Sequence, residues 1–207
     1  QKTAYEIHER LVGSEMCIRD RYGLGSKNGL EPISEFYFWS LLMGQSNAYE
    51  IPFNIYGDSL RVKVLVPGAA SGVLVGGNLS LICSVMGSKS EVRTTNSIIF
   101  PEDVGESPYK VDRYLQELKL AGKFDHINGL IIGRFSRRKT EEPDKPTDFK
   151  MEEVFRQYFS KLKVPVIYDF PSGHGSKNIS IPFGAQVDIN TDNQLFKLLE
   201  MPVSIDN

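Results

Sequence analysis

The most constraining feature of this sequence is an apolar run that leads into an acidic turn. Residues 98–101 read Ile-Ile-Phe-Pro and residues 102–106 read Glu-Asp-Val-Gly-Glu. A short apolar run of this kind is typical of a strand that is buried on both faces of a sheet. The ends of such strands are where α/β proteins gather their site residues. The sequence therefore predicts that a buried strand delivers Glu102 to a candidate site at its C-terminal end.

A helix is predicted directly after this acidic turn. Ser107 is a suitable N-cap and Pro108 a suitable first helical residue, and Gly122 can end the helix in the left-handed conformation. The apolar residues of the segment recur at spacings of four and three, which places them on one face: Val111, Leu115 and Leu118. Glu102 is thus expected on a short connection between two rigid elements, where catalytic groups are commonly held.

The rest of the sequence alternates between strand and helix patterns, which predicts the α/β class. Extended segments are expected at residues 49–55, 60–66, 72–75, 127–135, 164–168 and 185–189. Valines at 62, 64 and 66 alternate with other residues, which indicates a strand with one buried face. Helices are expected at residues 35–43 with Ser34 as N-cap, between Asn78 and Gly87, and at residues 151–162.

Residues 1–21 resemble translated sequencing-library DNA rather than native protein. Gln1–Ile7 reads as the flow-cell primer of short-read sequencing, and Leu11–Asp20 reads as the transposase adapter, in the same frame and order. An ordinary amphipathic helix is the alternative that composition alone would allow. We therefore leave this segment out of the functional reasoning, so that His8 and Cys17 carry no chemistry.

Composition excludes several classes of function. The chain has 207 residues, of which 41% are hydrophobic, enough for one good core or two small ones. A net charge of -2 gives no electrostatic reason to expect nucleic acid or an anionic membrane as a partner. No apolar run approaches the roughly 18 residues that span a bilayer, and Cys83 is expected to be a small buried hydrophobe. The sequence predicts a soluble, cytoplasmic protein.

Four short motifs occur in an order that resembles the LD-carboxypeptidase family. They are Gly76-Gly77-Asn78-Leu79-Ser80, the acidic turn at 102–106, Asp112-Arg113, and Ser172-Gly173-His174-Gly175. The family includes muramoyl-tetrapeptide carboxypeptidases and microcin C self-immunity peptidases, and the resemblance covers Tyr22 to about Thr191. It implies a two-domain serine peptidase with an N-terminal flavodoxin-like domain and a C-terminal mixed α/β domain of the swivelling type. Residues 22–56 would then be a remnant of the first domain and a linker, and residues 57–207 the C-terminal domain.

The resemblance also implies catalytic roles. A histidine between two glycines is more often structural when judged alone, but the family's catalytic histidine lies in this turn. His174 would be the general base and Glu102 the residue that orients it, with Asp103 and Glu106 as alternatives for the second role. The family's nucleophilic serine lies upstream of the segment that matches Tyr22, where this chain has the adapter-like sequence. The chain is therefore expected to lack its nucleophile and to be inactive alone.

Substrate contacts are predicted at two places, each with a structural alternative. Gly76, Gly77 and Asn78 open a helix whose amide groups can bind an anion, or the glycines only permit tight packing. Arg134 begins a basic cluster and can meet a substrate carboxylate, or it belongs to a solvated loop. The residues outside the adapter-like segment show no paired His or Cys spacing for zinc, so we expect neither a metal nor a cofactor.

The resemblance implies a parent enzyme that releases the terminal D-alanine from murein tetrapeptides in cell-wall recycling and works as a homodimer. A self-immunity peptidase that cleaves a peptidyl-nucleotide toxin is the alternative within the family. A non-catalytic anion- or peptide-binding module, using the helix start after Gly76–Asn78, is the alternative outside it.

Overall fold

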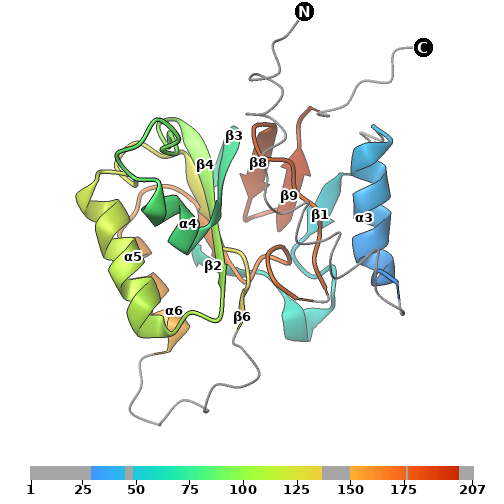
Figure 1. The fold of residues 1–207 in the computed structure, drawn as a ribbon. Helices are drawn as coiled ribbons and strands as arrows, with labels where there is room; N and C mark the ends of the chain where they lie inside the picture. The colour runs from blue at the N-terminus through green and yellow to red at the C-terminus, as the bar shows by residue number, and fades with distance from the viewer. Residues whose placement is uncertain (1–28, 45–48, 137–149, 176, 201–207) are drawn as a thin grey trace, which may run out of the picture.

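The fold is a mixed sheet with helices on both of its faces (Figure 1). The structure, a computed structural model, describes residues 29–44, 49–136, 150–175 and 177–200. The adapter-like residues 1–21 lie outside these ranges. Within them, none of the helices is both long and apolar enough to cross a membrane. The expected α/β class is confirmed.

Parallel strands form the centre of the sheet, and antiparallel strands extend it on both sides. In the described part of the chain the order across the sheet is β1-β9-β8-β3-β4-β5-β7-β2, with β6 beside the end of β4. The neighbours from β3 to β7 run parallel, which requires crossover connections. The strands are β1 (Glu50–Pro52), β2 (Lys63–Val66), β3 (Ala69–Asn78), β4 (Ser97–Val104), β5 (Gly129–Ile131), β6 (Phe135–Ser136), β7 (Val166–Tyr168), β8 (Gln186–Asn190) and β9 (Leu195–Leu198).

Three helices supply the crossovers and cover one face. These are α4 (Leu79–Ser84), α5 (Pro108–Leu120) and α6 (Met151–Phe159). The helix α3 (Pro32–Leu42) lies apart from them, beyond β1 and β9 in Figure 1. A short 3-10 helix, η3 (Asp58–Leu60), precedes β2.

The alternation of side chains along β4 divides the interior into two cores. Ile98 and Phe100 point into the core that includes Tyr37 and Leu41 of α3. Ile99 points into the opposite core, which is formed with α4, α5 and α6. Because β4 is buried on both faces, the continuous apolar run in its sequence is explained.

The central elements agree with the sequence, whereas several boundaries do not. Helix α5 buries the predicted face, although the side chain of Ser107 makes no capping hydrogen bond. Helix α3 begins at Pro32 instead of Glu35, because Glu31 rather than Ser34 caps it. In the segment 60–66 the predicted alternation is wrong: Val62 is buried but Val64 is exposed, on a strand at the sheet edge. The strand β9 was not predicted.

Candidate active site

Glu102 is a fully buried carboxylate near the C-terminal end of β4. Two glycines from neighbouring segments make room for it. A Cβ atom at Gly133 would lie 2.9 Å from the Cβ of Glu102, and one at Gly173 would lie 3.1 Å from the Cβ and from Oε2. Larger residues at either glycine would displace the glutamate, so the two turns define its position.

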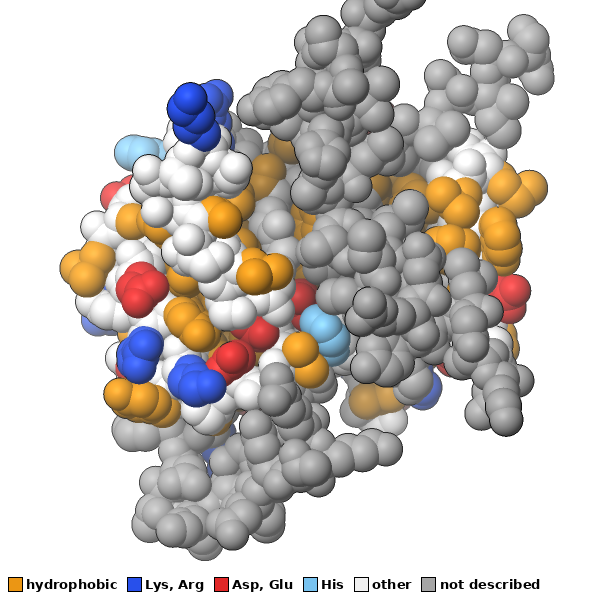
Figure 2. Space-filling view, viewed as in Figure 1, with side chains coloured by type: hydrophobic (Ala, Val, Ile, Leu, Met, Phe, Trp, Pro, Cys, Tyr) orange, Lys and Arg blue, Asp and Glu red, His pale blue; other side chains and the backbone are white. Residues whose placement is uncertain are grey.

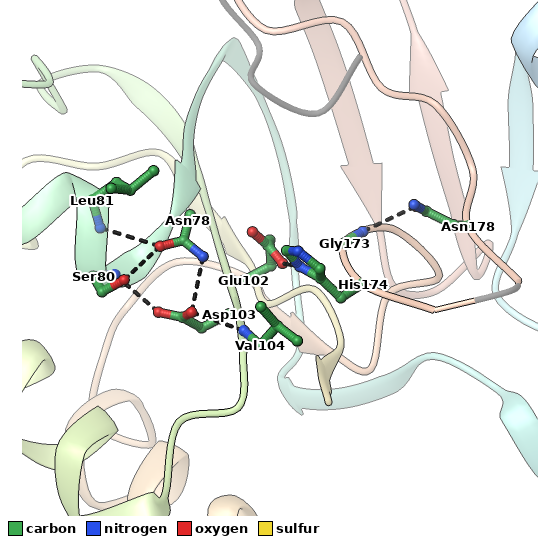
Figure 3. Close-up of polar contacts among 9 residues, drawn as sticks. All are labelled: Asn78, Ser80, Leu81, Glu102, Asp103, Val104, Gly173, His174 and Asn178. Carbon is green, nitrogen blue, oxygen red and sulfur yellow. Dashed lines mark hydrogen bonds and ion pairs between the residues drawn. The ribbon is translucent and has the colours of Figure 1, made fainter. Parts of the chain in front are cut away.

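The imidazole of His174 meets this carboxylate. Its Nδ1 lies 2.6 Å from Glu102 Oε2 (Figure 3). The predicted approach of the two side chains to hydrogen-bond distance is confirmed. The side chain of His174 is 18% exposed, whereas that of Glu102 is inaccessible to solvent. A buried carboxylate in this place can hold the proton on Nδ1 and leave Nε2 to act as a base.

The loop that presents His174 is fixed at both ends. It follows β7, and its Gly173 has a positive φ of 115° that favours glycine. The backbone N–H of Arg134 donates to Ser172 O at 3.0 Å on one side of the histidine. On the other side, Asn178 Oδ1 accepts from the backbone N–H of Gly173 at 3.1 Å. The loop thus holds the ring against the end of β4.

The two alternative acids for orienting His174 have other partners. Asp103 Oδ1 accepts from Asn78 Nδ2 and from the backbone N–H of Val104, both at 2.8 Å. Glu106 lies 3.0 Å from Lys110 Nζ. Among the three carboxylates of the acidic turn, Glu102 is therefore the one placed to orient the imidazole.

The helix start after Gly76–Asn78 is filled by the chain itself. Asp103 Oδ2 accepts from the backbone N–H of Ser80 at 2.9 Å, and Asn78 caps the N–H of Leu81. An external anion would have to displace these groups, and α4 has only six residues. A Cβ at Gly76 would lie 2.2 Å from Phe100 O, which supports the packing alternative for this glycine.

Arg134 contacts the His174 loop through both its backbone and its side chain. Its Nη1 donates to Lys177 O at 3.1 Å, and its guanidinium carbon lies 5.8 Å from the centre of the Tyr56 ring. Burial lowers the pKa of Arg134 from its ordinary value. Its Nη2 is buried without a hydrogen-bond partner. The observed contacts of Arg134 stabilise the His174 loop. The predicted contact of Arg134 with a substrate carboxylate stays a prediction.

Sequence patterns alone do not reveal the polar residues that join α3 to the His174 loop. Ser34 of α3 accepts from the backbone N–H of Asn178 at 3.0 Å, across 144 positions of the chain. No local pattern reports a contact between positions so far apart. His126, which precedes β5, is exposed. In the described part of the chain no three His, Cys, Asp or Glu side chains are grouped to hold a metal ion.

Comparisons with known proteins give a consistent assignment. Residues 71–189 match the family model described as the LD-carboxypeptidase C-terminal domain. A probable murein peptide carboxypeptidase of Bacillus subtilis is 38% identical over 142 residues, which are 69% of this chain and 44% of that protein. The murein tetrapeptide carboxypeptidase of Pseudomonas aeruginosa is 32% identical over 114 residues, which are 55% and 36% of the two chains.

Solved structures extend the likeness to the fold. The muramoyltetrapeptide carboxypeptidase of Oxalobacter formigenes superposes with a TM-score of 0.64 at 21% identity, over 84% of this chain and 56% of that one. The microcin C7 self-immunity protein MccF superposes with a TM-score of 0.60 at 25% identity, over 69% and 42%. The chain spans less than half the length of the curated relatives in Bacillus and Pseudomonas.

Proposed function

The chain belongs to the LD-carboxypeptidase family, and from that premise we propose that it carries the Glu–His half of a serine carboxypeptidase that acts on murein peptides. The observation that supports this most is the 2.6 Å contact between His174 Nδ1 and the buried Glu102. Such a pair is what a serine hydrolase needs beside its nucleophile. The Bacillus and Pseudomonas relatives, named as murein peptide and murein tetrapeptide carboxypeptidases, indicate the substrate class.

The geometry gives each residue a chemical role. His174 Nε2 takes the proton of the nucleophilic serine as the serine oxygen attacks the scissile carbonyl carbon. It then gives that proton to the amine of the departing D-alanine, and the acyl-enzyme is released by water with the same base. Glu102 holds the imidazole in the required tautomer and stabilises the imidazolium. The serine comes from the part of family proteins that this chain does not span.

The domain division of the parent protein is part of the proposal. Residues 57–207 form the C-terminal domain, residues 22–56 are a remnant of the N-terminal domain with its linker, and residues 1–21 are not native. The exposed apolar side chains of α3 support this, because Phe36 and Trp39 are 52% and 44% exposed. Figure 2 shows hydrophobic side chains at the surface on the side where α3 lies. The intact enzyme would be a cytoplasmic homodimer without a cofactor.

A self-immunity peptidase is the second candidate. MccF of Escherichia coli is 25% identical over 138 residues, which are 66% of this chain and 39% of that protein. Because a serine peptidase of either kind would use the same Glu–His pair, the pair does not choose between the two substrates. Assays with both a murein tetrapeptide and a peptidyl-nucleotide separate them.

The first prediction tests the catalytic pair in a complete enzyme. Residues 22–207 are joined to the N-terminal half of the Bacillus relative, and release of D-alanine from a murein tetrapeptide is measured. The joined protein should be active and the chain alone inactive. His174→Ala should lower kcat by about 10⁶-fold and Glu102→Ala by about 10⁴-fold, since losing the base costs more than losing its orienter. KM should change little in both variants.

Two outcomes would contradict this proposal. A joined protein whose kcat is indifferent to His174 would remove the mechanism, and the exposed His126→Ala serves as the matched control. Activity of the chain alone would mean that it contains another nucleophile. The first residues to test in that case are Ser172, which is buried two positions before His174, and Ser176, which lies outside the described residues.

A further inference from the structure

We propose that Ser34 and Asn178 are positioning residues that tie the His174 loop to α3, a helix outside the segment matched by the family model. The inference rests on the proposed function, in which His174 is the general base. It assigns part of the catalytic geometry to a polar contact between two distant parts of the chain.

The contact runs through one asparagine that serves both partners. Asn178 Oδ1 accepts from the backbone N–H of Gly173 at 3.1 Å, which closes the loop around His174. The backbone N–H of Asn178 donates to Ser34 Oγ at 3.0 Å. Two consecutive hydrogen bonds therefore connect Gly173, the residue before His174, to Ser34 of α3.

Ser34 is held firmly enough to act as an anchor. Its side chain is buried, and its Oγ lies 3.0 Å from Glu31 Oε2 and 2.9 Å from the hydroxyl of Tyr56. Glu31 Oε2 also accepts from the backbone N–H of Ser34 and from the hydroxyl of Tyr56, both at 3.0 Å. An ionised carboxylate can accept hydrogen bonds but cannot donate them. Glu31 therefore accepts the hydroxyl proton of Ser34, which leaves a lone pair of Ser34 Oγ to accept from the N–H of Asn178.

The loop needs such an anchor because its own sequence does not fix it. Gly173 and Gly175 flank the histidine with φ values of 115° and 150°, and glycine restricts the backbone less than any other residue. Arg134 holds the loop through Ser172 and Lys177, but it belongs to the same domain. The hydrogen bond from Asn178 to Ser34 of α3 is different, because α3 lies outside residues 71–189, the segment that the family model matches.

The experiment uses NMR on the 207-residue chain, because the nucleophile is not required. An Nδ1–H proton hydrogen-bonded to a carboxylate gives a strongly downfield resonance, and it reports the contact between His174 and Glu102. The resonance should be present in the parent chain and lost in Glu102→Gln. In Ser34→Ala it should broaden or disappear, whereas Ser34→Thr, which keeps the hydroxyl, should retain it.

Amide exchange supplies a second readout at the loop itself. In Ser34→Ala, exchange of the Gly173 and Asn178 amides should accelerate by about tenfold, the scale of one lost hydrogen bond. The matched control is Ser40→Ala, a buried serine of the same helix that makes none of these contacts. It should leave both the resonance and the exchange rates unchanged.

A variant in the loop keeps the test decisive if Ser34→Ala does not fold. Asn178 is only partly buried, so Asn178→Ala should fold, lose the downfield resonance and expose the Gly173 amide to exchange. Asn178→Asp, which keeps the accepting oxygen, should restore both. In the joined enzyme Asn178→Ala should lower kcat with little change in KM, a split that a merely stabilising residue would not produce.

The outcomes separate this inference from the proposed function. If the resonance and the exchange rates survive both Ser34→Ala and Asn178→Ala, the positioning role is overturned while the Glu–His pair stands. If the parent chain shows no downfield resonance, the catalytic pair itself fails. In that case the exchange rates of Gly173 and Asn178 still decide whether α3 holds the loop.

Discussion

At the scale of single residues, the site depends on three carboxylates that have different partners. Glu102 contacts His174, and Asp103 fixes the start of α4 through Asn78. Glu31 gathers hydrogen bonds from Ser34 and Tyr56 at the base of α3. Each of these acids has at least one donor of its own, which offsets the cost of removing a carboxylate from water, although Oε1 of Glu102 is buried without a hydrogen-bond partner. The charge of Glu31 should therefore matter for stability.

The second prediction concerns the pH dependence that Glu31 confers. Burial alone would raise the pKa of Glu31, but hydrogen bonds from Ser34 and Tyr56 lower it overall from its ordinary value of 4.5. An acid whose folded-state pKa is lowered stabilises the protein above its unfolded pKa, and this contribution is lost as the pH falls through the folded value. Glu31→Gln should therefore be less stable than the parent at pH 7 and should lose less stability below pH 4.5.

Chemical denaturation at pH 7 and at pH values below 4.5 measures this difference. Glu35→Gln, an exposed carboxylate on the same helix, should keep the parental change with pH. If Glu31→Gln and the parent lose the same free energy of unfolding on acidification, Glu31 is not the source of the effect.

The sequence predicted the two central residues of the site but not their support. Glu102 could be found because it follows an apolar run, whereas the role of His174 rests on the family resemblance, since a histidine between two glycines is more often structural when judged alone. The resemblance placed Glu102 ahead of Asp103 and Glu106, and the contact of Glu102 with His174 supports that choice, because neighbouring side chains at a strand end point in different directions. Ser34 could not be found, since its partner Asn178 lies 144 positions away.

At the scale of elements, glycine turns bring two strand ends close enough to share a site. A Cβ at Gly173 would press on Glu102, whereas one at Gly175 would meet nothing within 4 Å. Both glycines have positive φ values, so alanine at either position strains the backbone. Comparing alanine variants of these two glycines therefore separates the effect of crowding at Glu102 from the effect of backbone strain.

The third prediction uses this matched pair in the joined enzyme. Gly173→Ala and Gly175→Ala should each cost about 1–3 kcal/mol of stability from backbone strain. Gly173→Ala should lower kcat much further, because the added methyl group displaces the carboxylate that orients His174. Denaturation curves and D-alanine release measure the two effects. Equal kcat values for the two variants would show that the close approach of Gly173 to Glu102 does not control the position of the glutamate.

Elements with a strong local pattern were predicted, and those that depend on distant partners were not. Helix α5 shows a clear apolar stripe and follows its pattern. Strand β9 is short, and its Phe196 is buried because the strand pairs with β1 and β8. The sequence of β9 alone does not reveal this pairing. Strand β2 departs from its alternation because it lies at the sheet edge, where Val64 meets solvent. Edge position depends on the order of strands, which no single segment encodes.

At the scale of the whole molecule, α3 is apolar on both of its sides. Its inner residues Tyr37 and Leu41 enter the core, while its outer side exposes Phe36 and Trp39. A helix that is apolar all round is normally buried. Because the chain spans 44% of its Bacillus relative, we expect the N-terminal half of such a protein to cover this outer side.

The fourth prediction tests that cover through Trp39, the single tryptophan of the chain. Trp39 is 44% exposed, so its emission in the chain alone should be that of a solvated indole and readily quenched by acrylamide. In the joined protein, with tryptophans of the added half replaced by phenylalanine, emission should shift to shorter wavelength and quenching should fall. Phe36→Ser should destabilise the joined protein but not the chain alone.

The control for this prediction lies on another helix. Leu120 of α5 is 78% exposed and lies on the helical layer opposite α3, so Leu120→Ser should alter neither protein. If joining the N-terminal half leaves the emission of Trp39 unchanged, the outer side of α3 is not the contact between the domains. If the emission shifts, α3 contacts both domains at once. The contact from Ser34 to Asn178 would then connect the domain that carries the serine to the loop that carries the base.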